Sequence, residues 1–255
     1  MSPPSLSQVL LTDEYWRQRS AAVVPEASFG VEWASGKGAL TELLTATWDY
    51  LLAMELDAEF CRVLRRKLSA DEAGVLRTDV LSYPLPERSD TYPLVGNLPY
   101  HLTGPLLEKL AKNTSTMGSF TGLIQWEVAH RLDANPGDSE YRSISVLMNW
   151  AFDVRLLDRV PGSAFTPEPD VDSGLIQLKS KSPDRPFESM STLIQRCFQQ
   201  PRKTLLNNLA DSSEQKDSWR LWMQQNNWNI KRRPSSLTVE EIKEVHDRWA
   251  QDEFS

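Results

Sequence analysis

The sequence is poor in cysteine and histidine and has no long apolar run. Its two cysteines, Cys61 and Cys197, and its three histidines are far apart and lack metal-ligand spacing. This excludes a disulfide scaffold, indicates no metal site and suggests a reducing compartment. No apolar stretch approaches the roughly 20 residues of a membrane-spanning helix, and the N-terminus lacks the features of a signal peptide. We therefore expect a soluble cytoplasmic protein.

Basic residues are also in deficit, with 28 Lys and Arg against 35 Asp and Glu, for a net charge of −7. This balance argues against a general polyanion-binding protein, because phosphate contacts require Lys and Arg. The deficit lies in the first part of the chain, since residues 181–255 hold 12 basic and 11 acidic residues. Basic clusters at 202–203 and 231–233 therefore permit a local basic face.

Two phosphate-binding motifs are absent. The dinucleotide fingerprint fails because Thr41 replaces its third glycine, and Lys37 is followed by Gly38 rather than by Ser or Thr as in a P-loop. Residues 29–34 nevertheless form a short apolar strand pattern, followed by a glycine turn at 35–38 and a helical pattern at 39–47. Strand, glycine turn and helix open a nucleotide-binding α/β sheet. S-adenosylmethionine carries no phosphate, so it fits a nucleotide-binding sheet without these two motifs better than a phosphate-bearing nucleotide does.

Acidic residues end three successive predicted strands, at Glu32, Glu55 and Asp79. Glu55 stands 17 positions after Gly38, which suits a carboxylate that accepts from ribose hydroxyls, and Asp79 suits a purine amino group. The ends of parallel strands meet at one edge of a sheet, so the three acids should converge there. A general preference for polar residues at strand ends explains each acid singly, but it is a poor explanation for all three.

The stretch Asn97-Leu98-Pro99-Tyr100 follows an apolar strand at 92–96. The exocyclic amine of adenine is a weak nucleophile because its lone pair is delocalised into the ring. The Asn97 side-chain oxygen and the Pro99 carbonyl can accept both N–H bonds, while Tyr100 stacks on a base removed from its helix. No strong general base is then needed. The alternative is a plain strand-to-helix turn, where Asn and Pro are common for backbone reasons.

The remaining pattern predicts two domains, at residues 1–180 and 181–255. The first continues with a helix, a strand, a second helix, a rigid proline-rich segment and a closing strand, at 103–112, 120–125, 127–132, 161–173 and 174–178. After a linker at 179–186 the pattern becomes helical, with four short helices at 187–199, 202–210, 217–225 and 238–250. Such helices are too short to be stable alone and should form a small helical domain.

Taken together, these motifs resemble the ribosomal RNA adenine N6-dimethyltransferases of the KsgA type, over about residues 8–250. The matching segments, in family order, are 8–11, 32–41, 55–57, 79, 97–100, 125–129, 164–173 and 202–205. The resemblance implies a Rossmann-like class I methyltransferase sheet with a small C-terminal helical RNA-binding domain. It also implies S-adenosylmethionine as the methyl donor and the small ribosomal subunit, with its rRNA, as the partner of a monomeric enzyme.

The resemblance assigns roles residue by residue. Catalysis falls to Asn97, Pro99 and Tyr100. Donor binding falls to Gln8, Leu10, Glu32, Ala34, Gly36, Gly38, Glu55, Leu56, Asp79 and Asn97. Substrate binding falls to Phe165, Arg202, Lys203, Arg232 and Arg233. The implied reaction adds two methyl groups to the exocyclic amines of adjacent adenosines near the end of small-subunit rRNA.

The chain departs from the family pattern at five positions. Ala34 replaces a glycine of the donor loop, Val9 and Leu10 replace Asn and Phe, and Asp170 and Pro201 stand where basic residues are usual. An alanine fits the loop if its φ is negative. Lost basic residues weaken phosphate contacts. Two alternatives therefore stay open: a divergent binding factor for ribosome assembly or transcription with weak or no methylation, and a resistance methylase of large-subunit rRNA.

Overall fold

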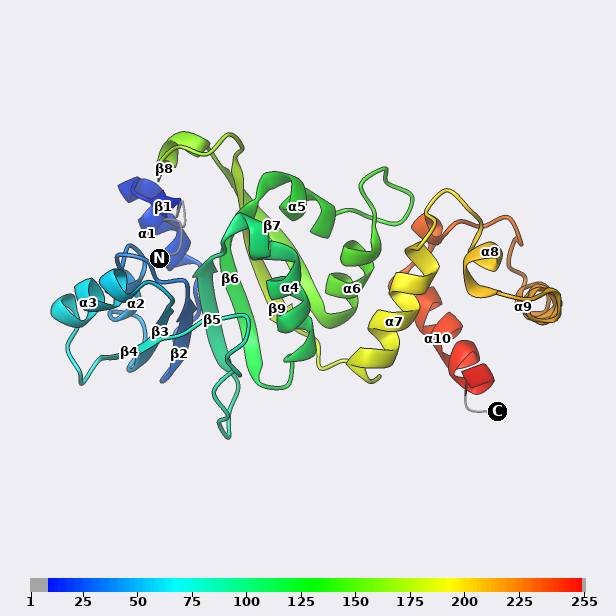
Figure 1. The fold of residues 1–255 in the computed structure, drawn as a ribbon, viewed down its shortest axis with the longest axis horizontal. Coiled ribbons are helices and arrows are strands. Elements are labelled where there is room, and N and C mark those ends of the chain that lie inside the picture. The colour runs from blue at the N-terminus through cyan, green and yellow to red at the C-terminus, as the bar shows by residue number, and fades with distance from the viewer. Residues whose placement is uncertain (1–8, 254–255) are drawn as a thin grey trace, which may run out of the picture. The chain divides into compact units, whose positions relative to one another are not determined.

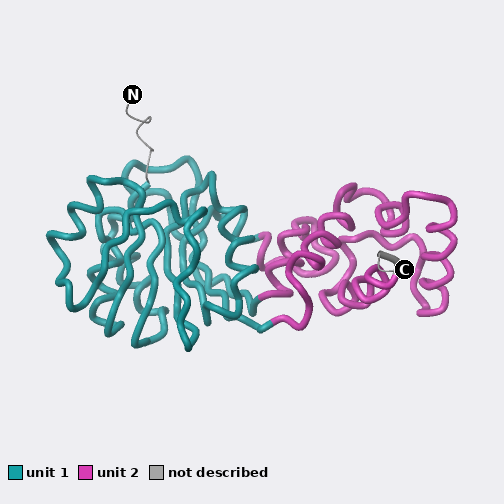
Figure 2. The backbone as a smooth tube through the Cα atoms, turned by 60° about the horizontal axis from the view of Figure 1, so that its bottom comes forward, with its two compact units in different colours: residues 1–130, 152–182 teal, residues 131–151, 183–255 magenta. Residues whose placement is uncertain are grey.

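The computed structural model describes residues 9–253, and the chain divides into two compact units (Figure 2). Unit 1 comprises residues 1–130 and 152–182, and unit 2 comprises residues 131–151 and 183–255. The sequence analysis predicted one boundary at residue 180, which assigned residues 131–151 to the first domain rather than to the second. Helix α6 (Ser143–Ala151) packs on α7 (Phe187–Phe198) and α10 (Val239–Glu253). This packing explains why 131–151 belong to unit 2.

Unit 1 is built on a seven-stranded sheet in the order β4-β3-β2-β5-β6-β9-β7 (Figure 1). Neighbouring strands are parallel from β4 to β6, and β9 is antiparallel to both β6 and β7. The strands are β2 (Gly30–Trp33), β3 (Leu51–Glu55), β4 (Ala73–Arg77), β5 (Tyr92–Asn97), β6 (Met117–Gln125), β7 (Phe152–Val160) and β9 (Ser173–Ser180). The predicted α/β class with a mainly parallel sheet is thus present.

The central strands are buried on both faces, which is why they appear in the sequence as continuous apolar runs. All four residues of β2 are buried, as are residues 92–96 of β5. Helices α2 and α3 pack on β3, α3 also packs on β4, and α4 packs on β6. The helical elements of this part are α1 (Glu14–Ala22), α2 (Thr41–Leu44), α3 (Ala58–Lys67), η1 (Tyr100–Leu102), α4 (Thr103–Lys112) and α5 (Trp126–Leu132).

The strand order reverses beside β2. From β2 the chain moves outward through β3 to β4, and it then returns to place β5 on the other side of β2. Ligands of open α/β sheets bind at such a reversal, outside the carboxyl ends of the strands. Glu32 in β2, Glu55 in β3 and Asn97 in β5 lie at or next to those ends. The topology therefore brings the predicted acids and the Asn97 stretch to one edge.

A separate two-stranded sheet joins the N-terminal segment to the proline-rich segment. Strand β1 (Leu10–Leu11) pairs antiparallel with β8 (Phe165–Thr166), so Leu11 lies opposite Phe165. The short helix η2 (Gly162–Ala164) precedes β8. Leu11 and Phe165 both belong to the hydrophobic core of unit 1. Burial of these two side chains holds the N-terminal segment in place.

Unit 2 is helical, and its inserted segment is tied to its C-terminal part. The Tyr141 hydroxyl donates to the Leu237 carbonyl at 2.9 Å. The helix predicted at 202–210 is shorter than expected, because the Thr204 side chain caps α8 (Leu205–Leu209) by accepting from the Asn207 N–H. The other elements are α9 (Ser213–Gln225) and η3 (Pro234–Ser236). Among residues 9–253, none of the helices is long and apolar enough to cross a membrane.

Candidate active site

A cavity of about 820 Å³ opens at the carboxyl ends of β2, β3 and β5 in unit 1. Among its lining residues are eleven that the sequence analysis proposed as site residues: Leu10, Glu32, Ala34, Gly36, Gly38, Glu55, Leu56, Asp79, Asn97, Pro99 and Tyr100. Gln8, the remaining donor-binding prediction, lies outside the described residues. One continuous cavity thus joins the predicted donor residues to the predicted catalytic residues.

The turn after β2 has three residues in the left-handed region, with φ of 54° at Ala34, 58° at Gly36 and 91° at Gly38. A side chain at Gly36 would place its Cβ 3.0 Å from the Leu10 Cδ2 atom. The two glycines therefore allow a path that other residues rarely adopt. The sequence analysis required a negative φ for an alanine to fit this loop, and Ala34 does not meet that condition. An alanine in this conformation costs about 1–3 kcal/mol, so the donor loop is strained.

Glu55 fastens this turn to the end of β3. One carboxylate oxygen accepts from the Gly36 N–H at 2.8 Å, and the other accepts from the Asp57 N–H at 2.8 Å. The residue is 1% exposed, so the carboxylate has a fixed orientation. A carboxylate oxygen can accept more than one hydrogen bond. This arrangement suits the predicted contact with ribose hydroxyls.

Glu32 is buried beneath the same turn. Its carboxyl oxygen accepts from the Thr41 hydroxyl at 2.6 Å. Burial raises the pKa of Glu32 to about 8; hydrogen bonds from Thr41 and Ser35 lower it, and the negative charge of Glu55 raises it. Glu32 is therefore mainly protonated at neutral pH. A neutral carboxyl that joins β2 to α2 holds the loop without placing a second negative charge beside Glu55.

Asp79 lies just after β4 and lines the cavity. One of its carboxylate oxygens accepts from the Leu81 N–H at 2.9 Å, and the other accepts from the Ser82 hydroxyl at 3.1 Å. Both oxygens are thus held by the turn that Asp79 opens. The side chain is only half-buried, so it can still accept from an amino group in the cavity.

A residue that the sequence analysis missed supports this turn. The Lys109 ammonium, from α4, donates to the carbonyls of Val80 at 2.7 Å and Leu81 at 3.1 Å, and also to that of Tyr83. Burial lowers the pKa of Lys109, while the negative charge of Asp79 raises it. The only sequence signal was a lysine on the apolar helix 103–112, which does not identify carbonyl partners more than 20 residues away.

The Asn97 side chain is held by the N-terminal segment. Its amide nitrogen donates to the Val9 carbonyl at 3.1 Å. Because the NH₂ group faces Val9, the amide oxygen is left to accept a hydrogen bond. The Pro99 carbonyl accepts from the Leu102 N–H at 2.9 Å and from the Thr103 hydroxyl at 3.4 Å, and these two contacts fix its direction. Asn97 thus presents an oriented acceptor, and the Pro99 carbonyl becomes a second one when the Thr103 hydroxyl turns away from it.

Tyr100 begins η1, and its ring is half-buried. Its hydroxyl shares a hydrogen bond of 2.8 Å with the hydroxyl of Ser173. Burial raises the pKa of Tyr100, Ser173 lowers it through the hydrogen bond, and the charge of Asp172 raises it. The phenol therefore stays neutral and offers an aromatic face at the cavity.

None of the five predicted substrate residues is among the lining residues of this cavity. Phe165 is 3% exposed, packs in the core of unit 1 and is not a lining residue. Phe165 thus lies in the core rather than at the cavity, and its role in substrate binding stays a prediction. The β1–β8 pairing places Phe165 opposite Leu11, and both side chains are buried.

The four basic predictions all lie in unit 2, and they fall into two kinds. Arg202, Lys203 and Arg233 are exposed. Arg232 instead binds both carboxylate oxygens of Glu241, each at 2.7 Å, and its guanidinium lies 4.8 Å from the centre of the Trp228 ring. The Arg232 side chain thus stabilises unit 2, whereas the other three keep their charges at the surface.

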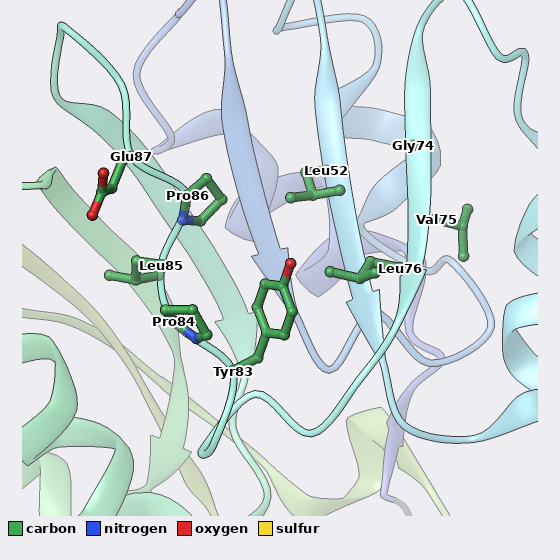
Figure 3. A pocket seen from close by; sticks show the side chains of 9 residues that line it. All are labelled: Leu52, Gly74, Val75, Leu76, Tyr83, Pro84, Leu85, Pro86 and Glu87. Atoms are coloured by element: carbon green, nitrogen blue, oxygen red, sulfur yellow. The ribbon is translucent and has the colours of Figure 1, made fainter.

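A second cavity of about 560 Å³ lies between the β3–β4 face and the segment that follows Tyr83 (Figure 3). Leu52 and Leu76 point towards it, and Pro84, Leu85 and Pro86 border it on the other side. Its one charged lining residue is Glu87. Since it lacks converging polar groups, donor and amine chemistry is assigned to the larger cavity.

The family model that matches this chain and two of its relatives all belong to the ribosomal RNA methyltransferases. The family model for "Ribosomal RNA adenine dimethylase" matches residues 11–247. The "Ribosomal RNA small subunit methyltransferase A" of Thermotoga maritima is 33% identical over 249 residues, which cover 96% of this chain and 84% of that protein. The protein of the same name from Bacillus licheniformis is 31% identical over 262 residues, covering 96% and 90%.

Solved structures agree on the fold. A dimethyladenosine transferase from Plasmodium falciparum superposes with a TM-score of 0.80 at 20% identity, covering 95% of this chain and 98% of that one. The 23S rRNA methyltransferase ErmE superposes with a TM-score of 0.71 at 21% identity, covering 95% and 100%. At these identities the likeness confirms the predicted class I methyltransferase fold.

Proposed function

Because the chain belongs to the ribosomal RNA adenine dimethylase family, we propose that it dimethylates the exocyclic amines of adjacent adenosines in small-subunit ribosomal RNA. Relatives at 31–33% identity that bear the small-subunit name support this choice of RNA. The observation that carries the proposal is the single cavity lined by Glu55, Asp79, Asn97 and Tyr100.

The residues present fit S-adenosylmethionine as the donor. Glu55 would accept from the ribose hydroxyls and Asp79 from the adenine amino group, while Gly36 leaves room beside Leu10 for the backbone to approach the ligand. The acids Glu32, Glu55 and Asp79 line the cavity at the strand ends, and Arg17, Lys37 and Lys67 also line it. When bound, the donor supplies a methyl group on a positively charged sulfur.

We assign the acceptor half of the site to Asn97, Pro99 and Tyr100, with the Thr103 hydroxyl giving up its contact to the Pro99 carbonyl when the base is bound. The Asn97 amide oxygen and the Pro99 carbonyl accept the two N–H bonds of the adenine amine, which localises the nitrogen lone pair. Tyr100 stacks on the extruded base. With the donor bound, the amine nitrogen held by Asn97 and Pro99 would take the methyl group from the sulfur, and the excess proton of the resulting ammonium would leave to solvent. Rate then comes from orientation and fixed dipoles rather than from a strong base.

Unit 2 is proposed to bind the RNA backbone. Arg202, Lys203 and Arg233 are exposed cations, and their charges suit phosphate contacts that carry no sequence information. Arg232 supports this surface through its pair with Glu241. We further propose that the enzyme acts as a cytoplasmic monomer, because the described lining of the cavity comes from unit 1 alone and bacterial relatives bear the small-subunit rRNA name.

One observation favours the alternative of a binding factor with weak methylation. Ala34 holds a conformation that glycine adopts far more readily, at a turn that lines the donor cavity. If the strain or the extra methyl group prevents donor binding, the protein would act through its RNA contacts alone. Measurement of the donor dissociation constant by calorimetry separates the two functions.

The test is methyl transfer from labelled S-adenosylmethionine to small ribosomal subunits that lack the adenosine methylations, followed by mass analysis of nucleosides. We expect dimethyladenosine. The Asn97→Ala variant should bind the donor normally and transfer nothing. Activity on large-subunit RNA alone would instead identify a resistance methylase. Absence of both transfer and donor binding would leave the binding function.

A further inference from the structure

We propose that Ser173 is a positioning residue that sets the orientation of the Tyr100 ring for base stacking. The inference rests on the proposed function and deepens it, because Ser173 does not line the cavity and would act only through Tyr100. Its hydroxyl lies 2.8 Å from the Tyr100 hydroxyl, across 73 positions of sequence.

Ser173 occupies a rigid place in unit 1. It is the first residue of β9 and is fully buried, with an exposure of 0%. It pairs with Gln125 of β6 on one side and with Val160 of β7 on the other. A strand held on both edges moves little, so its hydroxyl is a fixed reference point for a neighbouring side chain.

Asp172, the residue before Ser173, is held by three hydrogen bonds. The Asp172 carboxylate accepts from the Arg159 guanidinium at 2.8 Å and from the Gly162 N–H at 3.1 Å. Its backbone carbonyl accepts from the Trp126 N–H at 2.9 Å. Because Asp172 closes the proline-rich segment in this way, the position of the Ser173 hydroxyl is set by β6, β7 and the segment together.

Tyr100 needs such an anchor. It begins η1, a helix of three residues with no side-chain cap, so the local backbone does little to fix its rotamer. A single hydrogen bond at the far end of the ring restricts rotation about both side-chain torsions. When a base stacks, the face of a pre-oriented ring is available without a further loss of rotamer entropy.

The test is a double-mutant cycle with Ser173→Ala and Tyr100→Phe, measured as methyl transfer to unmethylated small subunits. Each single change should lower kcat about tenfold, the size expected when one positioning contact is lost, and the double variant should be no slower than Tyr100→Phe alone. Donor affinity should stay within about twofold. Ser180→Ala is the matched control, because Ser180 donates to the Met117 carbonyl at the other end of β9.

Independent, multiplicative losses would overturn the inference, as would an unchanged kcat for Ser173→Ala. A second readout needs no RNA and remains informative if the wild-type protein transfers no methyl group. In protein labelled at its six tyrosines, the ring resonances of Tyr100, assigned through Tyr100→Phe, should shift and broaden in Ser173→Ala. Unaltered Tyr100 resonances in that variant would refute positioning whether or not the enzyme is active.

Discussion

The side-chain amide of Asn97 donates to the backbone carbonyl of Val9, 3.1 Å away and 88 positions earlier in the chain. The acceptor belongs to the main chain, so the Val9 side chain, which departs from the family pattern, does not alter it. The contact decides which end of the Asn97 amide remains available. It also links Asn97, the proposed catalytic asparagine, to β1, which starts one residue after Val9.

From this contact we predict that Asn97→Asp lowers kcat at least about 100-fold with little change in donor affinity. An aspartate has no N–H to donate, and its oxygen would be repelled by the Val9 carbonyl, so the side chain must turn. Val9→Ala keeps the carbonyl and should retain wild-type activity. Steady-state methyl transfer with calorimetric donor binding measures both. A strong loss in Val9→Ala would show that the side chain matters after all.

The strained turn gives a prediction about stability. Ala34→Gly should raise the free energy of unfolding by about 1 kcal/mol, because glycine adopts a φ of 54° without the steric cost. For a protein of this size that corresponds to a rise in Tm of roughly 2–4 °C. Donor affinity should stay equal or increase.

Ala39 supplies the control for this change. It follows the same turn but does not belong to the residues with positive φ, so Ala39→Gly should lower the stability. Thermal unfolding of both variants decides the matter. Equal destabilisation by the two glycines would mean that the Ala34 conformation carries no strain.

The sequence predicted the fold and most of the cavity for a physical reason. Parallel strands place their carboxyl ends at one edge of the sheet. The acids at or near the ends of β2, β3 and β4, which are Glu32, Glu55 and Asp79, therefore had to converge. The family, the fold and the buried strands were accordingly confirmed. Roles within the cavity remain predictions until ligands are bound.

What the sequence did not predict depends on tertiary geometry. The φ of Ala34 is set by the path between β2 and α2, and the burial of Phe165 is set by the pairing of β8 with β1. Residues 131–151 joined unit 2 because α6 packs on α7 and α10, which no local pattern encodes. The same holds for Ser173, whose partner is 73 positions away.

Substitutions of two adjacent arginines of unit 2, Arg232 and Arg233, should have different effects, one on stability and the other on RNA binding. Arg233→Ala should weaken binding to rRNA and reduce the slope of log affinity against log salt by about 0.7–0.9, the value for one lost phosphate contact. Arg232→Ala should instead lower the free energy of unfolding by about 1–2 kcal/mol, since it removes the two hydrogen bonds that Arg232 donates to the Glu241 carboxylate. Salt-dependent binding and urea unfolding measure the two effects. A stability loss in Arg233→Ala of the same size would contradict this division.

The buried Glu32 carboxyl makes stability depend on pH. Its pKa rises from 4.5 to about 8 in the folded protein, so between these values the folded state binds a proton that the unfolded state has released. The free energy of unfolding therefore falls as pH rises through this window. In Glu32→Gln the neutral amide removes this term, and the decline should become shallower. Urea unfolding from pH 5 to pH 8 tests the difference between the two slopes, and parallel curves would count against a protonated Glu32.

Lys109 should control donor affinity from outside the cavity lining. Its ammonium holds the carbonyls of Val80, Leu81 and Tyr83, and so fixes the turn that orients the Asp79 carboxylate. Lys109→Met fits the same space but donates nothing, so Asp79 loses its fixed direction. We expect donor binding about tenfold weaker, the effect of losing hydrogen bonds from a charged group, with kcat at saturating donor nearly unchanged.

The matched control is Lys112→Met, which changes an exposed lysine near the end of the same helix and should leave donor affinity as it is. Calorimetry with S-adenosylhomocysteine gives the affinities, and transfer at saturating donor gives kcat. A fall in kcat with unchanged affinity would place Lys109 with the acceptor half of the site instead. Because the Lys109 ammonium holds the carbonyls of the Asp79 turn, a loss of affinity in Lys109→Met with unchanged kcat would support the view that this turn must be held rigid before the adenine amino group is bound.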